Sequence, residues 1–326
     1  MYMYSQEQLT TGINDYIDAL NYNPQPSGLY DPIRYVLAAG GKRMRCILML
    51  MAYNMYKEDV KTIYPNAAGL ETYHNFTLLH DDLMDRADMR RGRPTVHKKW
   101  NDNAAILSGD AMIILAYQLM TCNGGQNQDK ILKTFSDAAL GVCEGQQYDM
   151  EFEQRDDVTE GEYMEMIRLK TSVLLAAALK IGALLAGASD DDAQLLYEFG
   201  EKVGLAFQLQ DDYLDVYGDP KVFGKKIGGD ILCNKKTFML INTMALCDDL
   251  QRKDLQAWID KADFVPEEKI KAVKAIYDAV DIKTVCKNKM QQLYDEGFLA
   301  FSKVSVEESR KTMLKEYVEQ LMGRKY

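Results

Sequence analysis

The sequence predicts an all-α protein built as one large helical bundle, and three observations lead to that fold class. After Pro94 there is no proline until Pro220, and none follows Pro266, whereas a proline inside a helix costs about 3 kcal/mol. Apolar residues recur every three to four positions, as they do on one face of a helix. No stretch keeps the apolar and polar alternation of a half-buried strand.

Two segments show the helical spacing most clearly. Behind Ser5 and Gln8, which have the spacing of a capping box, the apolar residues are Leu9, Ile13, Ile17 and Leu20. The same spacing returns at Leu195, Leu196, Phe199, Val203 and Phe207. The most apolar segment, residues 172–188, contains Lys180 and is too short to span a bilayer comfortably, so we expect a core helix there.

Turn-forming residues divide these helices without dividing the chain into domains. Gly, Pro, Asn, Asp and Ser cluster at residues 23–28, 122–128, 189–192 and 217–220, where we expect loops. No change of composition and no low-complexity linker interrupts the 326 residues. We therefore expect a single domain over residues 1–326.

Charge and cysteine content narrow the classes of function. The net charge of −10 argues against nucleic acid as a general partner, because phosphate backbones are bound by basic surfaces. The six cysteines are scattered, with no C-x-x-C pair, so we expect free thiols in a reducing compartment. The first residues lack the basic and apolar regions of a signal peptide. We expect a cytoplasmic protein without a transmembrane segment.

The segment LLHDDLMDRADMRRGRP, residues 78–94, places three aspartates in five positions, at Asp81, Asp82 and Asp85. On a helix Asp81 and Asp85 share a face. In a half-buried cleft, two carboxylates about 5.5 Å apart repel by about 3 kcal/mol at an effective dielectric near 20, and a cation turns that repulsion into an attraction. Oxygen ligands favour a hard ion, and a few carboxylates beside a phosphorylated substrate suit Mg²⁺ better than Ca²⁺.

One D-D-x-x-D match arises readily by chance in an acidic chain. We expect the other acidic runs, at residues 156–157, 190–192 and 248–249, to be solvated loops or helix starts. A second match favours metal binding, because FQLQDDYLDVYGD places Asp211, Asp212 and Asp215 behind another apolar helical run. Helical bundles commonly build metal sites from carboxylates on facing helices, so the sequence predicts two facing acidic walls.

Basic residues accompany both aspartate motifs. AAGGKRMRCIL brings Lys42, Arg43 and Arg45 to an expected helix start, where backbone N–H groups and cations favour anions. Further basic residues stand at Arg90, Arg91 and Arg93, at Lys170, and at Lys225, Lys226, Lys235 and Lys236. Either group alone is typical of an ordinary surface. Together with the aspartates they predict an anionic substrate held by metals and by Lys and Arg, and diphosphate fits both.

These motifs give the chain a marked resemblance to the trans-isoprenyl diphosphate synthases, the farnesyl and geranylgeranyl diphosphate synthase family. The matching motifs are GGKRMR, HNFTLLHDDLMDRADMRRGRPTVH, GQQYD, LKTS, FQLQDDYLD and FGKKIGGDI, in the family's order and spacing over nearly the whole chain. One departure is Cys46, where many relatives have proline. The resemblance implies a bundle of the isoprenoid synthase type with a central active-site cavity.

The resemblance also implies a role for each matching position. Three Mg²⁺ ions and the allylic diphosphate would be held by Asp81, Asp85 and Asp211, supported by Asp82, Asp212 and Asp215. The grip on that diphosphate would be completed by Arg90, Lys170, Lys225 and Lys235. Isopentenyl diphosphate would be bound by Lys42, Arg45, His74 and Arg91. Thr171 and Gln208 would steady the carbocation, while Gln146 and Asp149 would support the metal cluster.

The implied reaction needs these residue types. Condensation begins when the allylic C–O bond ionises, and metals with fixed Lys and Arg stabilise the leaving diphosphate best. Three Mg²⁺ and six ionised aspartates cancel in charge, which leaves a trianionic diphosphate to be matched by Arg90, Lys170 and Lys225. The isopentenyl double bond then attacks the cation, and a proton leaves to a diphosphate oxygen. No nucleophilic triad is required.

Product length is expected to depend on the residues before the first aspartate motif. On a helix, Phe76 lies five residues before Asp81 and about a turn and a half deeper, where it would stop the growing chain. Thr77 beside it is not aromatic, unlike its counterpart in animal farnesyl synthases. The resemblance therefore implies a C15 or C20 product, and we favour geranylgeranyl diphosphate. The alternative is that Phe76 is ordinary core packing.

Two other functions share parts of this pattern. A class I terpene cyclase has the same helical fold and first aspartate motif, but it usually lacks a second D-D-x-x-D and an isopentenyl-binding set. A non-catalytic subunit of a heteromeric prenyl synthase tends to lose its aspartate motifs, and both are intact here. The family resemblance further implies a homodimer.

Overall fold

The structure is a computed structural model that describes residues 2–123, 125–219 and 227–323. The described chain is helical apart from one hairpin of two-residue strands, which confirms the all-α prediction. The elements are α1 (Gln6–Asp18), α2 (Ser27–Leu37), α3 (Met44–Asn54), η1 (Val60–Ile63), α4 (Tyr64–Met84), β1 (Met89–Arg90), β2 (Arg93–Pro94), α5 (Val96–Lys99), α6 (Asp102–Met120), η2 (Gly125–Asn127), α7 (Gln128–Glu153), α8 (Glu160–Ile167), η3 (Arg168–Ser172), α9 (Val173–Ala186), α10 (Asp190–Tyr217), α12 (Gly229–Leu232), α13 (Phe238–Leu246), α14 (Asp249–Asp260), α15 (Pro266–Ala279), α16 (Ile282–Ser302) and α17 (Glu308–Met322).

The chain divides into two compact units. Unit 1 comprises Met1–Phe135, Ala177–Gln194 and Ser305–Lys315, and unit 2 comprises Ser136–Ala176, Leu195–Val304 and Glu316–Tyr326. The chain passes between the units within α7, α9, α10 and α17. The single domain expected over residues 1–326 stays a prediction.

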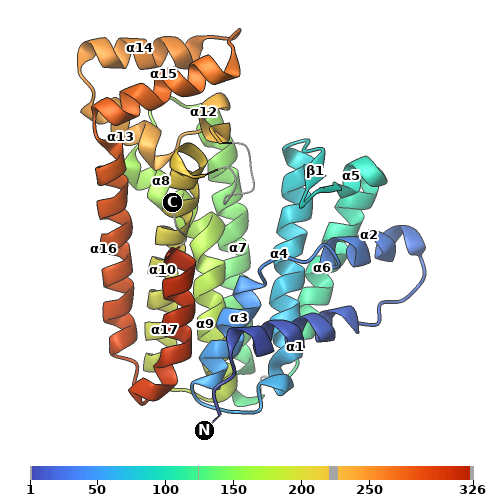
Figure 1. Ribbon diagram of the computed structural model, residues 1–326. Coiled ribbons are helices and arrows are strands. Elements are labelled where there is room, and N and C mark those ends of the chain that lie inside the picture. The colour runs from blue at the N-terminus through green and yellow to red at the C-terminus, as the bar shows by residue number, and fades with distance from the viewer. Residues whose placement is uncertain (1, 124, 220–226, 324–326) are drawn as a thin grey trace. The chain divides into compact units, whose positions relative to one another are not determined.

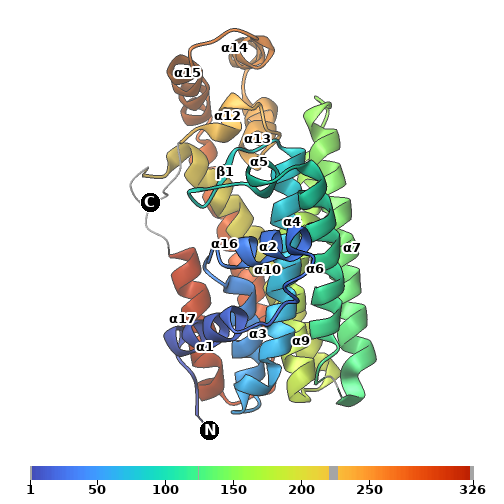
Figure 2. The ribbon, with the colours of Figure 1, turned by 90° about the vertical axis from the view of Figure 1, so that its right-hand side faces the viewer.

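Unit 1 is organised around α4 and α6, which pack side by side (Figures 1 and 2). Helices α1, α2 and α3 also contact α4. Helix α1 begins with the predicted capping box, in which Ser5 and Gln8 satisfy each other's backbone N–H groups, and it buries Leu9, Ile13 and Ile17 as expected. It ends at Asp18, so Leu20 lies beyond the helix.

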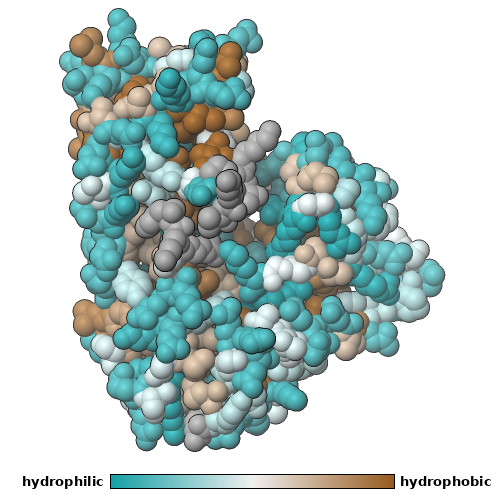
Figure 3. Space-filling model, viewed as in Figure 1, coloured by the Kyte–Doolittle hydropathy of each residue, from teal (hydrophilic) through white to brown (hydrophobic). Residues whose placement is uncertain are grey.

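Unit 2 has its own hydrophobic core, to which α8, α10, α13, α15 and α16 contribute. Helices α14 and α15 pack against each other, and α15 also contacts α12 and α16. Hydrophilic residues cover most of the face seen in Figure 3, and hydrophobic residues gather mainly around α12 to α15. Leu246, Leu250 and Val265 are exposed in that region.

The structure corrects two local expectations. Ser27 and Gly28 belong to α2 rather than to the loop expected at residues 23–28, and α2 contains Pro32. The acidic run at residues 190–192 begins α10, and a helix start is one of the two structures predicted for it. Asp192 is buried rather than solvated. It accepts hydrogen bonds from Tyr56 Oη at 3.1 Å and from Ser305 N at 2.8 Å, which compensate its carboxylate for the lost water.

Two helices are long and apolar enough to cross a bilayer, by length and composition alone. In Glu160–Ala186, 83% of the most apolar window is buried inside the protein, as expected for the core helix predicted at residues 172–188. In Asp102–Met120 the buried share is 33%. One or two such helices are weak evidence for a membrane span, because core helices meet the same criteria.

The contact between α9 and α3 in unit 1 depends on Gly182, because a Cβ at this position would collide with the carbonyl oxygen of Met49. We predict that Gly182→Ala lowers the free energy of unfolding by about 1–3 kcal/mol, since the backbones must separate. Denaturant unfolding followed by circular dichroism measures the change.

The matched control is Gly28→Ala in α2, where an added Cβ meets nothing within 4 Å. Alanine favours helix over glycine, so this control should unfold at the same or a slightly higher denaturant concentration. A Gly182→Ala protein as stable as the wild type would show that the helix contact is not this close.

Candidate active site

The first aspartate motif, Asp81, Asp82 and Asp85, lies at the C-terminal end of α4 in unit 1. Asp81 and Asp82 are in the last turn, Asp85 is the C-cap, and the last turn contains no basic residue. A helix C-terminus already carries a partial negative charge, so carboxylates there are unfavourable without a cation. Asp82 is buried, which raises its pKa despite the opposing charge of Arg90, whereas Asp85 is exposed.

Arg90 binds this motif from the β1–β2 hairpin. Its Nε donates to Asp82 Oδ1 at 2.7 Å, and its Nη2 lies 3.3 Å from Asp81 Oδ2. The hairpin turns at Arg91 and Gly92, both in the left-handed region with φ of 50° and 72°, as the tight turns of hairpins require. The structure thus brings predicted residues Asp81, Asp82 and Arg90 together, with Arg90 paired to the aspartates.

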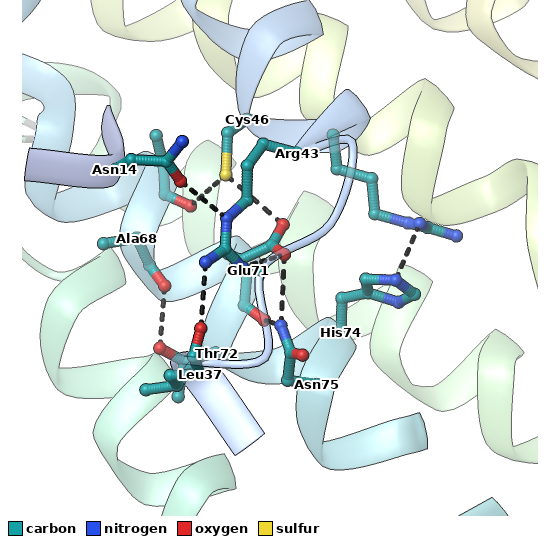
Figure 4. Close-up of polar contacts among 12 residues, drawn as sticks. Asn14, Leu37, Arg43, Cys46, Ala68, Glu71, Thr72, His74 and Asn75 are labelled. Carbon is teal, nitrogen blue, oxygen red and sulfur yellow. Dashed lines mark hydrogen bonds and ion pairs between the residues drawn. The ribbon is translucent and has the colours of Figure 1, made fainter. Parts of the chain in front are cut away.

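The residues predicted to bind isopentenyl diphosphate also lie in unit 1. Arg45 Nη1 is 3.1 Å from His74 Nε2 (Figure 4). Desolvation and the positive charges of Arg45, Arg91, Arg90 and Arg43 hold the pKa of His74 well below 6.5. His74 is therefore neutral at pH 7 and its ring nitrogen can accept a hydrogen bond from Arg45. Desolvation also lowers the pKa of Arg45 to about 10, so Arg45 stays charged.

The hairpin and the glycine-rich loop before α3 meet at Arg91. Its guanidinium donates to the carbonyl oxygen of Gly40. Gly40 and Gly41 have φ of 68° and 137°, and a Cβ at Gly41 would lie 2.9 Å from Arg91 Nη2. The glycines therefore allow both the left-handed backbone and the close approach of Arg91. Lys42 follows this loop directly, and the predicted helix start is confirmed, since α3 begins at Met44.

The second aspartate motif, Asp211, Asp212 and Asp215, occupies the last two turns of α10 in unit 2, and again no basic residue lies in the last turn. Asp212 is buried and accepts hydrogen bonds from Tyr163 Oη and, at 3.0 Å, from Gln208 Nε2. Asp215 Oδ2 accepts from the backbone N–H of Asp230 at 2.9 Å. Both motifs therefore place carboxylates at the negative end of a long helix.

Asp230 is a site residue that the sequence reasoning missed. Burial, and then the negative charges of Asp212, Asp215 and Asp149, raise its pKa to about 7 against the opposing charge of Lys235. A perturbed carboxyl beside charged partners is typical of functional sites. The available signal was its place in the motif FGKKIGGDI, which carried no assigned role for the aspartate.

Among the basic and polar residues predicted for unit 2, Gln208 and Lys235 act directly on Asp212 of the second aspartate motif. Lys170 Nζ lies 2.5 Å from Asp149 Oδ2, and Thr171 Oγ1 donates to Gln208 Oε1 at 3.0 Å. Burial raises the pKa of Asp149, but Lys235 and Lys170 outweigh it and leave that pKa below 3.8. Lys225 lies outside the described residues.

Gln146 and Asp149 are three positions apart on α7, so they share a face of that helix, and both are half-buried.

Lys170 and Thr171 lie in a π-helical turn, η3 (Arg168–Ser172), between α8 and α9. Two glycines leave room for this wider turn. A Cβ at Gly145 of α7 would lie 2.7 Å from Lys170 Cα, and a Cβ at Gly204 of α10 would lie 2.8 Å from Ser172 Cα. Single π-helical turns are frequent at functional sites because they redirect side chains. The sequence reasoning identified Lys170 and Thr171 but missed the turn that positions them.

The residues predicted to limit product length lie one to two turns before the first aspartate motif. Phe76 is buried, and its ring lies 5.4 Å from that of Tyr73 and 4.8 Å from that of His80. Thr77 is half-buried and donates its hydroxyl to the carbonyl oxygen of His74 at 2.8 Å. Phe76 therefore belongs to an aromatic cluster on α4 with tilted and edge-to-face contacts, as both the functional and the packing interpretations require.

The donor chemistry of both motifs fits magnesium. Each offers oxygen ligands only, at a helix end whose partial charge favours a cation. Among the described side chains no three potential ligands already converge on one point. Mg²⁺ is usually held by one or two carboxylates together with substrate phosphates and water, so a preformed protein cage is not required for this metal.

The fold and these residues define a class of protein: an all-α protein whose carboxylates and basic side chains suit metal-assisted chemistry on a phosphorylated substrate. The sequence model of the family described as "Polyprenyl synthetase" matches residues 26–280. The chain is 44% identical over 228 residues to "Geranylgeranyl diphosphate synthase" of Methanosarcina mazei, covering 69% of this chain and 70% of that protein. It is 40% identical over 224 residues to "Geranylfarnesyl diphosphate synthase" of Aeropyrum pernix, covering 66% and 70%.

A solved structure described as a geranylgeranyl pyrophosphate synthase superposes with a TM-score of 0.94 at 41% identity, covering 99% of this chain and 100% of that one. The chain therefore belongs to the polyprenyl synthetase family. It is a prenyltransferase of the trans-isoprenyl diphosphate synthase type with the isoprenoid synthase fold. These relatives set aside the terpene cyclase and the non-catalytic subunit as alternatives.

We predict that Gly145→Ala lowers kcat about tenfold or more, because the added methyl displaces Lys170 and Thr171. Steady-state kinetics with each substrate varied in turn measures the effect. The matched control is Gly161→Ala on α8, where the nearest atom to an added Cβ is Thr159 Oγ1 at 4.0 Å. Equal kcat values for the two variants would contradict a role for the π-helical turn.

Proposed function

We propose that this protein condenses isopentenyl diphosphate with an allylic diphosphate, head to tail, to give geranylgeranyl diphosphate. The observation that carries the proposal is the placement of each aspartate motif at a helix C-terminus close to a basic residue expected to bind phosphate, Arg90 at the first motif and Lys235 at the second. The relatives named as geranylgeranyl diphosphate synthases support the substrate class and the product.

In the proposed reaction the allylic diphosphate is bound through both aspartate motifs and departs as the leaving group. The carboxylates of the two motifs would hold Mg²⁺, three ions by the family resemblance, and these ions would supply positive charge to stabilise the leaving diphosphate. Lys170, oriented by Asp149, and Arg90, oriented by Asp82, bring further positive charge to its oxygens. Lys225 and Lys235 are proposed to contact the same diphosphate, and Gln146 is proposed to support the metal cluster.

The second substrate is proposed to bind through Lys42, Arg45, His74 and Arg91. Neutral His74 can accept a hydrogen bond from Arg45, which orients the guanidinium towards a diphosphate without adding a competing charge. Thr171 and Gln208 contact each other and present oxygen dipoles that stabilise an allylic cation. After the isopentenyl double bond attacks C1 of the cation, the proton lost from the new chain passes to an oxygen of the departing diphosphate.

Product length is proposed to depend on Phe76. Its burial in a cluster with Tyr73 and His80 makes it a rigid obstacle rather than a mobile side chain. The relatives include proteins named for both the C20 and the C25 product, so a modest change of pocket depth separates the two outcomes within this family. We favour C20, because a bulky aromatic residue occupies this position.

We propose that the enzyme acts as a homodimer. Helix α6 supports this assembly, because Ile106, Leu107 and Ile114 are 43%, 60% and 61% exposed. Large apolar side chains gathered on one exposed helix are typical of protein interfaces. The cytoplasmic location expected from the sequence stays a prediction.

We predict that Asp81→Ala and Asp211→Ala each lower kcat by about 10² or more, because each removes a carboxylate proposed to bind the metal ions. Initial rates with labelled isopentenyl diphosphate at saturating Mg²⁺ measure the loss, and circular dichroism checks that the fold is retained. Asp254→Ala, an exposed position on α14, serves as the control and should keep wild-type turnover. Normal activity in either motif variant would contradict the metal assignment.

We predict that the wild-type protein yields C20 chains from labelled isopentenyl diphosphate with C5, C10 or C15 primers, and that Phe76→Ala yields longer chains. Removing the ring opens space beneath the first aspartate motif, at a cost of about 3–5 kcal/mol in stability. Chromatographic sizing of the extracted products measures the chain length.

Ile13→Ala is the matched control, because it makes a cavity in the core under α1 and should leave product length unchanged. If Phe76→Ala gives the wild-type product, Phe76 is core packing only. A wild-type product of C15 or C25 would correct the chain length while leaving the reaction class intact.

A further inference from the structure

A buried ion pair lies directly behind the residues proposed to bind isopentenyl diphosphate. Arg43 Nη1 is 2.8 Å from Glu71 Oε1, and both side chains are 2% exposed (Figure 4). Neither residue has a role in the proposed reaction. Two charges this well buried are costly unless their hydrogen bonds are satisfied, so the surroundings of the pair decide what it does.

The Arg43 guanidinium connects three helices of unit 1. Besides Glu71 of α4, it donates through Nε to Asn14 Oδ1 of α1 at 3.0 Å and through Nη2 to the carbonyl oxygen of Leu37, the last residue of α2, at 2.9 Å. Arg43 itself is the N-cap of α3 in the left-handed region, with φ of 48°. That conformation costs about 1–2 kcal/mol for a residue with a side chain. The three hydrogen bonds hold the loop before α3 in this conformation from inside the protein.

The same pair fixes the spacing between that loop and His74. Lys42 precedes Arg43 and Arg45 follows two residues later, whereas Glu71 lies three residues before His74 on the same face of α4. Arg45 and His74 are in contact at 3.1 Å. The ion pair therefore joins the two segments that carry Lys42, Arg45 and His74.

Glu71 is also surrounded by other cations. Desolvation lowers the pKa of Arg45 and of Arg91, and the negative charge of Glu71 is the main opposing influence on both. Arg43 Nη1 and, at 3.1 Å, Asn75 Nδ2 both donate hydrogen bonds to Glu71 Oε1. The Cys46 thiol lies 3.5 Å from Glu71 Oε2. Without Arg43, the positive charges next to this carboxylate would be those of Arg45 and Arg91, and Arg45 would be drawn towards it.

We propose that Arg43 and Glu71 are positioning residues of the isopentenyl diphosphate site, which fix the loop of Lys42 and Arg45 and keep Glu71 from competing with the substrate for Arg45. The inference rests on the proposed function and adds to it the means by which the empty site is held ready. It also explains why a carboxylate lies beneath a site that binds an anion: Arg43 neutralises it.

The test is a kinetic comparison of Arg43→Met, Arg43→Lys and the double variant R43M/E71Q. Arg43→Met should raise KM for isopentenyl diphosphate about tenfold or more and leave KM for the allylic substrate within about twofold. Arg43→Lys keeps a charge opposite Glu71, so both KM values should stay within about twofold. The double variant removes the competing carboxylate. Its KM for isopentenyl diphosphate should therefore be only about threefold above the wild-type value.

The control is Asn54→Ala at the far end of α3, which removes buried hydrogen bonds to Tyr4 and Lys57 and so destabilises the same unit. It should leave both KM values unchanged. The proposal is overturned if Arg43→Met leaves KM for isopentenyl diphosphate unchanged, raises both KM values equally, or matches Asn54→Ala. If Arg43→Met does not fold, a double variant whose KM for isopentenyl diphosphate is raised about tenfold or more overturns it, because removing the carboxylate would then have given no recovery.

Arg45→Ala separates this inference from the proposed function. It removes a residue assigned to the substrate itself and should raise KM for isopentenyl diphosphate about 10²-fold. If Arg45→Ala has that effect and Arg43→Met has none, the positioning role alone fails. If Arg45→Ala also leaves KM unchanged, the assignment of the isopentenyl diphosphate site fails.

Discussion

The constraint on which this structure depends is the charge at two helix ends. Helices α4 and α10 both end in a D-D-x-x-D motif, at the end of the helix where the peptide dipoles already accumulate negative charge. Neither last turn contains a basic residue that would compensate within the helix. Stability alone would not select carboxylates at these positions. They are understandable if the charge is compensated from outside the helix, by basic side chains and by divalent cations that arrive with a phosphorylated substrate.

The chain supplies the first part of that compensation itself, and it does so from neighbouring elements. Arg90 reaches the first motif from a hairpin, and the positive charge of Lys235 acts on Asp212 of the second. Lys170 pairs with Asp149 of α7 from a π-helical turn. The arrangement is rigid where the chemistry needs accuracy, because glycines at Gly145 and Gly204 admit the wide turn and no larger residue fits. Beside the residues proposed to bind the other substrate, the buried Arg43–Glu71 pair is proposed to hold basic residues in place in the same way.

Much of this could be predicted from the sequence, and the remainder shows what a sequence pattern omits. Helical spacing and the scarcity of prolines predicted the all-α fold, and the spacing of the aspartates predicted which residues share a helix end. The π-helical turn could not be predicted, because one widened turn leaves the apolar spacing of residues 160–186 almost unchanged. Asp192 was expected in solvent because acidic runs usually are, and only the folded chain brings Ser305 to it. Asp230 and Glu71 were missed for a related reason, since their environment depends on residues distant in sequence.

The central claim is that both aspartate motifs bind metal ions that hold one diphosphate. A crystal grown with Mn²⁺, which gives an anomalous X-ray signal, and a non-reactive allylic thiolodiphosphate tests it most directly. The account predicts metal peaks on the oxygens of Asp81 and Asp85 and on Asp211, each about 2.0–2.3 Å from its ligands and each shared with the same diphosphate. Metal on one motif only, or a diphosphate bound by basic residues with no metal beside either motif, would contradict it.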